Sequence, residues 1–234
     1  MNIHLAALGL GILFLSACAP DQNILDRGVA ITMNEPASES RPAGQFPPRF
    51  AALVADTNVP ALILTVESRS QTGRLLMESR INGVETWLSS DLTGLMLENG
   101  MLQGTRGLGS ELFSAELSEP MALILSGRSG YSDRLHSYLN GNVEIVTRSY
   151  RCLVEVEGNA VIPLEIGNVS TRVMTEDCKS LDQSFRNTYW VNSNSGAIVQ
   201  ARQWAGGKLG YLKTQAATRS SAPTPASQEV VVGL

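Results

Sequence analysis

The feature that most constrains the fold of this chain is a series of turn dipeptides that divides its central part into short apolar runs. Two of them are Asn-Gly pairs between β-rich runs: Asn82-Gly83 between 75–81 and 84–89, and Asn99-Gly100 between 93–98 and 101–106. Asparagine and glycine accept the positive φ of two-residue hairpin turns. Four more candidate turns follow: Asn140-Gly141, Gly158-Asn159, Ser195-Gly196 and Gly206-Gly207. The pattern predicts a mainly β domain, an antiparallel meander that closes into a barrel-like or sandwich architecture.

One or two short helices accompany the strands. Pro48 to Asp56 is the better candidate, because proline suits a first turn and Phe50, Leu53 and Val54 fall on one face. A second helical turn is predicted near Gly107 to Ala115 from the spacing of its apolar residues.

The beginning of the chain has the pattern of an export signal. An uncharged apolar run from Leu5 to Leu15 is too short to span a bilayer as a helix and leads into Ser16-Ala17-Cys18. Leu15 to Cys18 resembles the bacterial lipobox, whose cysteine is acylated and becomes the first residue of the mature protein. We therefore expect Cys18 to carry lipid. The alternatives are an ordinary signal peptide cut nearby, or a buried apolar helix with an incidental cysteine.

These observations divide the chain into four parts. Residues 1–17 are the signal peptide, and residues 18–46 are the lipidated cysteine and a flexible, polar, proline-containing tether. Residues 47–214 form a single β-rich periplasmic domain. Residues 215–234, rich in Ala, Ser, Thr and Pro, form a disordered tail.

Two cysteines remain in the mature chain, Cys152 and Cys178. An exported bacterial protein meets an oxidising periplasm, so we expect them to form a disulfide. The alternative is a pair of buried thiols too far apart to be joined.

The chain offers few residues for catalysis or for binding cofactors. His136 is the only histidine after Cys18, and neither a zinc-ligand spacing nor a Gly-x-Ser-x-Gly elbow occurs. The glycine-rich stretch 104–109 lacks the Gly-Lys-Ser/Thr ending of a phosphate-binding loop. The formal net charge is −4 and the basic residues are scattered, which argues against nucleic-acid binding. We expect no enzyme activity, metal or cofactor.

Two groups of residues carry a family resemblance. Trp87-Leu88-Ser89-Ser90-Asp91, with residues 99–102 and 105–108, forms the first, and Asn187 to Asn192, with Gly196 and Gln203, forms the second. Together with the lipobox they resemble the YjbF/GfcB family of outer-membrane lipoproteins, which is associated with group 4 capsule and exopolysaccharide production. The resemblance covers about residues 48–214. It implies a β-rich domain that works beside other products of a polysaccharide operon, among them an outer-membrane β-barrel.

The leading hypothesis is a non-enzymatic lipoprotein at the periplasmic face of the outer membrane that assists assembly or export of capsular or extracellular polysaccharide. A polysaccharide-modifying lyase or hydrolase, and a purely structural envelope lipoprotein, are the alternatives. We expect the two signatures to meet in one patch that docks an export component, with glycan binding as a second use. The candidate patch residues are Trp87, Ser90, Asp91, Thr105, Tyr189, Trp190 and Gln203. The competing interpretation is that both groups are corners stabilised by local hydrogen bonds.

Overall fold

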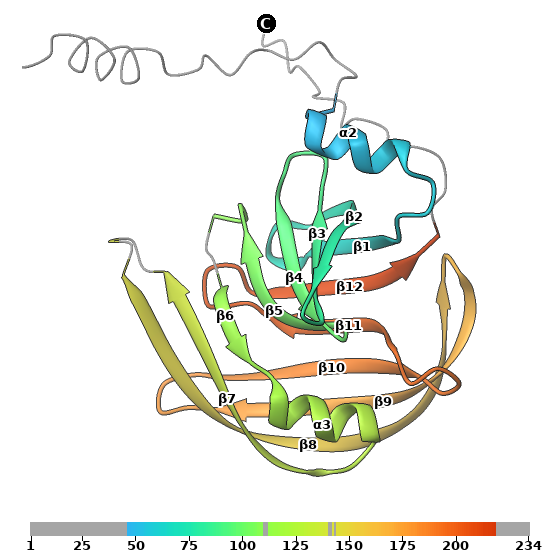
Figure 1. The fold of residues 1–234 in the computed structure, drawn as a ribbon. Coiled ribbons are helices and arrows are strands. Elements are labelled where there is room, and N and C mark those ends of the chain that lie inside the picture. Colours follow the sequence, from blue (N-terminus) through green and yellow to red (C-terminus); the bar gives the residue numbers. More distant parts are fainter. Residues whose placement is uncertain (1–45, 110–111, 140–141, 143, 219–234) are drawn as a thin grey trace, which may run out of the picture. The chain divides into compact units, whose positions relative to one another are not determined.

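The computed structural model describes residues 46–109, 112–139, 142 and 144–218 (Figure 1). The predicted signal peptide, Cys18 and nearly all of the tether lie outside the described residues, as does the tail from residue 219. The described part contains helices α2 (Pro48–Ala55) and α3 (Ser118–Ser126) and a 3₁₀ turn, η1 (Glu67–Arg69). Its strands are β1 (Ala61–Val66), β2 (Gln71–Ile81), β3 (Val84–Leu88), β4 (Gly94–Glu98), β5 (Met101–Arg106), β6 (Leu112–Glu116), β7 (Gly130–Leu139), β8 (Ile145–Leu164), β9 (Gly167–Lys179), β10 (Ser184–Asn192), β11 (Ile198–Trp204) and β12 (Tyr211–Ala217).

All twelve strands belong to one antiparallel sheet. Their order is β5-β4-β3-β2-β1-β12-β11-β10-β9-β8-β7-β6, so strands that pair in the sheet are consecutive in the chain, except for β1 and β12. That pair joins two meanders and places Ala61 opposite Ala217. The sheet thus includes residues 215–217, which the sequence assigned to the tail.

The two edge strands, β5 and β6, come together, so the sheet forms a nearly closed barrel (Figure 1). The hydroxyl of Thr105 in β5 accepts a hydrogen bond from the backbone N–H of Leu112 in β6 at 3.0 Å. Gly104 permits this approach, because a Cβ there would lie 3.2 Å from the carbonyl oxygen of Phe113. The predicted barrel-like antiparallel meander is confirmed.

The turn predictions are mostly confirmed. Asn82-Gly83 joins β2 to β3 and Asn99-Gly100 joins β4 to β5, with positive φ at all four residues. Ser195-Gly196 and Gly206-Gly207 lie between β10 and β11 and between β11 and β12. Asn140-Gly141 lies outside the described residues. The turn predicted at Gly158-Asn159 is wrong: the pair lies inside β8, where the register shifts between Val156 and Gly158 and glycine accommodates a bulge.

The helix at the start of the domain is confirmed, since α2 covers Pro48–Ala55. The helical turn predicted near Gly107 to Ala115 is wrong, because β6 begins at Leu112 and pairs with β7 through an irregular register at Leu112/Ser114. The second helix is α3. It has Pro120 in its first turn and ends at Gly127, whose φ is 68°.

The main apolar core fills the inside of the sheet, with side chains from β1–β6, β8–β12 and α3, among them Leu75, Leu95, Leu112 and Leu212. Phe50 of α2 packs in a second cluster with Ala61, Leu76 and Leu88. Among the described helices, none combines the length and apolar composition needed to cross a membrane.

Cys152 and Cys178 lie directly opposite each other on β8 and β9, and their sulfur atoms are bonded. Both are buried beside Tyr150 and Phe185. The bond therefore fixes the register between the two longest strands of the sheet.

Replacing both cysteines by alanine should lower the stability of the oxidised protein. Closing a loop of about 27 residues stabilises a fold by roughly 3–4 kcal/mol, which corresponds to a melting temperature lower by roughly 6–15 °C. Thermal unfolding followed by circular dichroism measures the difference. Wild-type protein treated with reductant is the control and should approach the double variant; equal melting temperatures for wild type and variant would contradict the prediction.

Candidate functional site

Strand β7 reverses the usual arrangement of polar and apolar side chains. Ser132, Arg134 and His136 point into the sheet and are fully buried, whereas Tyr131 and Leu135 are exposed. Polar residues thus occupy positions where a meander ordinarily places its apolar face. Charge in the interior must be neutralised by specific partners.

The partner of Arg134 is Glu176 of β9. Its Nη1 donates to both carboxylate oxygens, at 3.1 and 2.8 Å, and its Nε donates to Nε2 of His136 at 2.7 Å. Asn187 and Tyr189 of β10 each donate to Oε2 of Glu176 at 2.8 Å. All five side chains have 0% exposure, and we refer to these five residues as the buried polar cluster.

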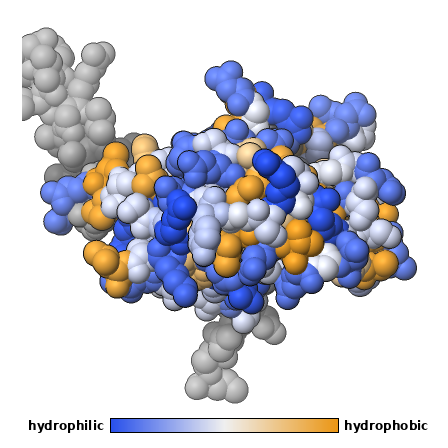
Figure 2. Space-filling model, turned by 90° about the horizontal axis from the view of Figure 1, so that it is seen from below, coloured by the Kyte–Doolittle hydropathy of each residue, from blue (hydrophilic) through white to orange (hydrophobic). Residues whose placement is uncertain are grey.

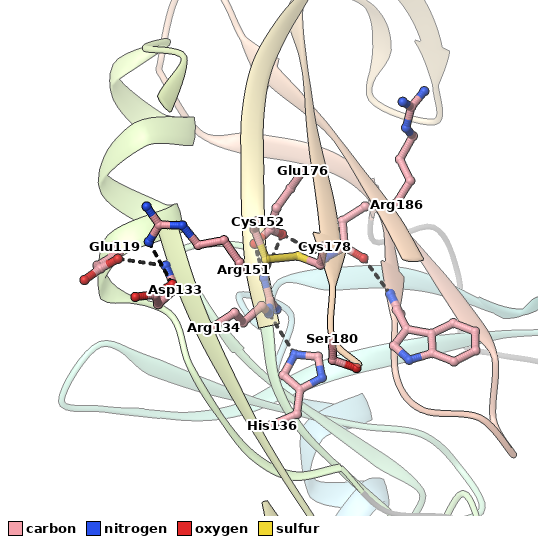
Figure 3. The surroundings of a disulfide bond; sticks show 12 residues. Glu119, Asp133, Arg134, His136, Arg151, Cys152, Glu176, Cys178, Ser180 and Arg186 are labelled. Atoms are coloured by element: carbon pink, nitrogen blue, oxygen red, sulfur yellow. Dashed lines mark hydrogen bonds and ion pairs between the residues drawn. A yellow bond between two sulfur atoms is a disulfide. The ribbon is translucent and has the colours of Figure 1, made fainter. Parts of the chain in front are cut away.

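The cluster lies against the disulfide (Figure 3). Glu176 and Arg134 lie beside the Cys152–Cys178 bond and His136 lies next to Arg134, whereas the carboxylate of Asp133 pairs with Arg151 outside the cluster. Cys152, Cys178 and Glu176 bring their ligand atoms within 4.8 Å of one another. Because the two sulfur atoms are bonded to each other, they are not available as thiolate ligands for a metal ion.

Burial and pairing fix the charge of each group in the cluster. Burial and, to a smaller extent, the adjacent charge of Arg134 lower the pKa of His136 to about 2, so the imidazole is neutral. Burial raises the pKa of Tyr189, and Glu176 adds to the effect. Burial opposes the charge on Arg134, but the carboxylate of Glu176 raises the pKa of the guanidinium. The arrangement holds an ion pair in the interior and gives solvent no contact with it.

The candidate patch residues lie in several different places. Trp87, Thr105, Tyr189 and Gln203 are buried, with at most 7% exposure. Tyr189 belongs to the buried polar cluster, and Thr105 joins β5 to β6. These four side chains offer little or no exposed surface, so the seven candidates do not form one exposed patch; of the four buried ones, only Trp87 lines a cleft.

Gln203 does connect the two signatures, but in the interior. Its Oε1 accepts the backbone N–H of Leu102 at 2.8 Å and its Nε2 donates to the carbonyl oxygen of Gly100 at 3.1 Å. Gly100 lies close to Ile198, where a Cβ would meet the Ile198 Cβ at 2.8 Å. The β4–β5 hairpin therefore packs against β11, across the inside of the sheet.

The remaining candidates do not share a location with Gln203. Ser90 and Asp91 lie in the β3–β4 turn, where Asp91 accepts hydrogen bonds from the backbone N–H and the hydroxyl of Thr93, at 3.2 and 2.9 Å, and from the Ser89 hydroxyl. Burial opposes ionisation, but these hydrogen bonds lower the pKa of Asp91. Asp91 thus stabilises the β3–β4 turn through local hydrogen bonds. Trp190 is half-buried and alternates with inward-facing Tyr189 and Val191 along β10.

A cleft of about 830 Å³ lies at the end of the sheet where β1 and β11 begin and β12 ends. Trp87 of the first signature and Gly196 of the second both line it, as does Ser195. Leu62 and Leu97 contribute to its floor, and Asn99 to its rim. The cleft, not a patch of the two signatures, is the accessible place where both regions meet.

Exposed apolar side chains elsewhere are dispersed. Figure 2 shows one face of the molecule, on which hydrophobic residues are scattered among hydrophilic ones. The most exposed large apolar side chains in the described residues are Leu181, Ile81, Val161, Tyr131 and Ile145. They come from different parts of the sheet, and scattered apolar residues of this kind are normal on a protein surface.

The fold and the cluster define the class of protein first: a single antiparallel, barrel-shaped sheet with an ion pair sealed inside it. A family model described as group 4 capsule polysaccharide lipoprotein gfcB, YjbF, matches residues 50–216, so the chain belongs to the YjbF family. This is a family of capsule-related lipoproteins and is not a known enzyme family.

A solved structure supports the fold. The crystal structure of the hypothetical lipoprotein YmcC from Escherichia coli K12 is similar, with a TM-score of 0.62 and 19% sequence identity. The similarity covers 88% of this chain and 100% of that chain. A comparison with curated proteins finds no match.

The buried polar cluster generates a prediction about paired substitutions. Arg134→Met or Glu176→Met alone should lower the free energy of unfolding by about 3–5 kcal/mol, because each leaves an unpaired charge in the interior. The double variant should lose less than the sum of the two, and urea denaturation measures all three. Arg148→Met is the control: it removes an exposed pair with Asp182 and should cost less than about 1 kcal/mol. Additive losses in the double variant would contradict the coupling.

The neutral state of His136 generates a second prediction. Unfolded histidine takes up a proton below pH 6.5, but folded His136 does not, so the unfolded state binds more protons and stability falls as the pH is lowered. Below pH 6.5 the loss approaches about 1.4 kcal/mol per pH unit. His136→Gln should therefore show a shallower decline between pH 7 and 5 in urea denaturation. Parallel declines in wild type and variant would contradict this assignment.

Proposed function

We propose that the protein is a non-enzymatic lipoprotein, anchored through Cys18 at the periplasmic face of the outer membrane, that assists assembly or export of a capsular or extracellular polysaccharide. The observation that carries the proposal is the extent of the family match. Residues 50–216 include all of the strands and both helices, apart from the first two residues of α2 and the last residue of β12. The whole folded domain, and not a segment of it, is thus what the chain shares with the capsule-related family.

The internal arrangement of charge supports a binding or assembly role over catalysis. His136, whose pKa is strongly lowered, lies in the buried polar cluster, which no substrate reaches. A general acid or base must come within hydrogen-bond reach of its substrate. We therefore assign the cluster a role in stabilising the fold, and we expect partners to bind at the surface.

The sequence around Cys18 supports the proposed anchor. Ala19 follows Cys18, whereas an aspartate at that position resembles the inner-membrane retention signal. The proposed partner is an outer-membrane β-barrel or another component of polysaccharide export. The lipid anchor would hold this domain beside it.

Deleting the gene should lower the amount of polysaccharide at the cell surface several-fold, and the wild-type gene should restore it. A Cys18→Ala variant should lose labelling by a fatty-acid analogue and restore little polysaccharide, because the protein is no longer held at the membrane. Surface polysaccharide is measured by extraction and sugar analysis. Cys152→Ala/Cys178→Ala is the matched control, since it should keep the lipid label.

The chain length and composition of the residual polysaccharide distinguish the enzyme alternative. Assistance in export predicts less polymer with unchanged chain length and composition, whereas loss of a lyase or hydrolase predicts that one of them is altered. Normal polysaccharide in the deletion strain would refute the proposed function.

A further inference from the structure

The cleft at the end of the sheet combines an apolar floor with a polar rim. Its floor includes Leu62, Leu97 and Val199, all less than 10% exposed, and its rim includes Asn58, Asn99 and Ser195. A volume of about 830 Å³ lies within the range of sites that bind small molecules, about 300–1,000 Å³, and barrel mouths are common places for them. The floor is formed by strands of the closed sheet, so the site is built on a rigid scaffold.

The charge of the cleft is balanced. Among the described residues that line it, Arg80 and Glu85 alone are charged, and they form an ion pair with each other. Glu85 also accepts the indole N–H of Trp87 at 3.0 Å. Pairing leaves no excess charge to attract a phosphate or a polycation, so the lining favours a ligand without net charge.

The uncharged polar side chains of the lining carry amides, hydroxyls and one indole. Asparagine amides and serine or threonine hydroxyls both donate and accept hydrogen bonds, as the hydroxyl groups of a sugar do. An indole and aliphatic side chains provide apolar contact for the C–H face of a pyranose ring, while the N–H of the indole is already held by Glu85. An acyl chain would instead be opposed by the polar rim and by Thr214, which is buried in the lining.

We propose that this cleft binds an uncharged segment of a glycan chain. The inference rests on the proposed function, because the connection to polysaccharide makes a glycan the relevant polyhydroxylated ligand. It goes further in assigning the ligand to one site and in specifying the chemistry of the segment. Within the site, Arg80 and Glu85 present planar hydrogen-bonding groups at the rim, and Trp87 forms part of the wall.

The test uses the full mature chain in detergent micelles and oligosaccharides released from the extracellular polysaccharide of the producing strain by partial acid hydrolysis. Anion exchange separates neutral from acidic fragments of equal length. Isothermal titration calorimetry should show saturable binding of the neutral fraction, with weaker binding of the acidic one.

Three variants locate the site. Arg80→Gln alters an exposed rim residue, and Ala197→Leu fills part of the cleft from an exposed position, so neither should disturb folding. Each should weaken binding at least tenfold. Ala122→Leu, an exposed position on α3 outside the cleft, is the matched control and should stay within twofold of wild type. Thermal unfolding verifies that all three are folded.

The outcomes separate the two proposals. Absence of binding by wild-type protein, binding that ignores both cleft variants, or preference for the acidic fraction would each overturn the glycan site. The proposed function would survive any of these results if the deletion strain still lacked surface polysaccharide. Conversely, glycan binding that depends on the cleft, in a strain whose surface polysaccharide is unaffected by deletion, would support the site and refute the export role.

Discussion

Closure of the sheet at β5 and β6 is the constraint on which the rest of the structure depends. A twelve-stranded antiparallel sheet that stayed open would leave two exposed edges and one uncovered apolar face. The chain closes it with a side-chain bond from Thr105 and a close backbone approach at Gly104, and Gln203 ties the hairpin at Gly100 to the opposite wall. With the inside sealed, an ion pair that would otherwise be hydrated has to be satisfied by protein groups alone.

The disulfide and the buried polar cluster depend on the same strand register. Glu176 faces inward because β9 pairs with β8 so that Cys178 lies opposite Cys152, two residues further along the same face. A slip of one residue would turn Glu176 to the outside and leave Arg134 without its partner. The disulfide therefore closes a loop and also holds the carboxylate of Glu176 in its position beside Arg134. The buried pair in turn favours one register over its neighbours, although it adds little net stability.

Much of the fold could be predicted from local signals. The Asn-Gly turns at residues 82–83 and 99–100 predicted two hairpins because asparagine and glycine tolerate the positive φ that such turns require. Gly158 misled the same reasoning, since a glycine that permits a bulge inside a long strand has the same local sequence as one that permits a turn. Helix α3 is marked in the sequence by Pro120 in its first turn and by Gly127 after its last residue, which are common at helix starts and ends.

The site was harder to predict. Arg134 and Glu176 are 42 residues apart in the chain, and alternation of polar and apolar residues in a strand ordinarily assigns the apolar ones, here Tyr131 and Leu135, to the core. Only the pairing of distant strands reverses that assignment. The cleft likewise joins residues from both meanders, so no single segment carries its signature. The sequence predicted that the two signatures meet. It did not predict that they meet through a buried hydrogen bond of Gln203 across the barrel.

The β1–β12 pair has a mechanical consequence. Because the strands are antiparallel, the beginning of β1 at Ala61 lies opposite the end of β12 at Ala217, and the two points where the chain enters and leaves the sheet are adjacent. A force that pulled these points apart would open the hydrogen bonds of the pair one after another, since they run perpendicular to the strands. The joint that unites the two meanders is therefore resistant to sliding and weak to peeling.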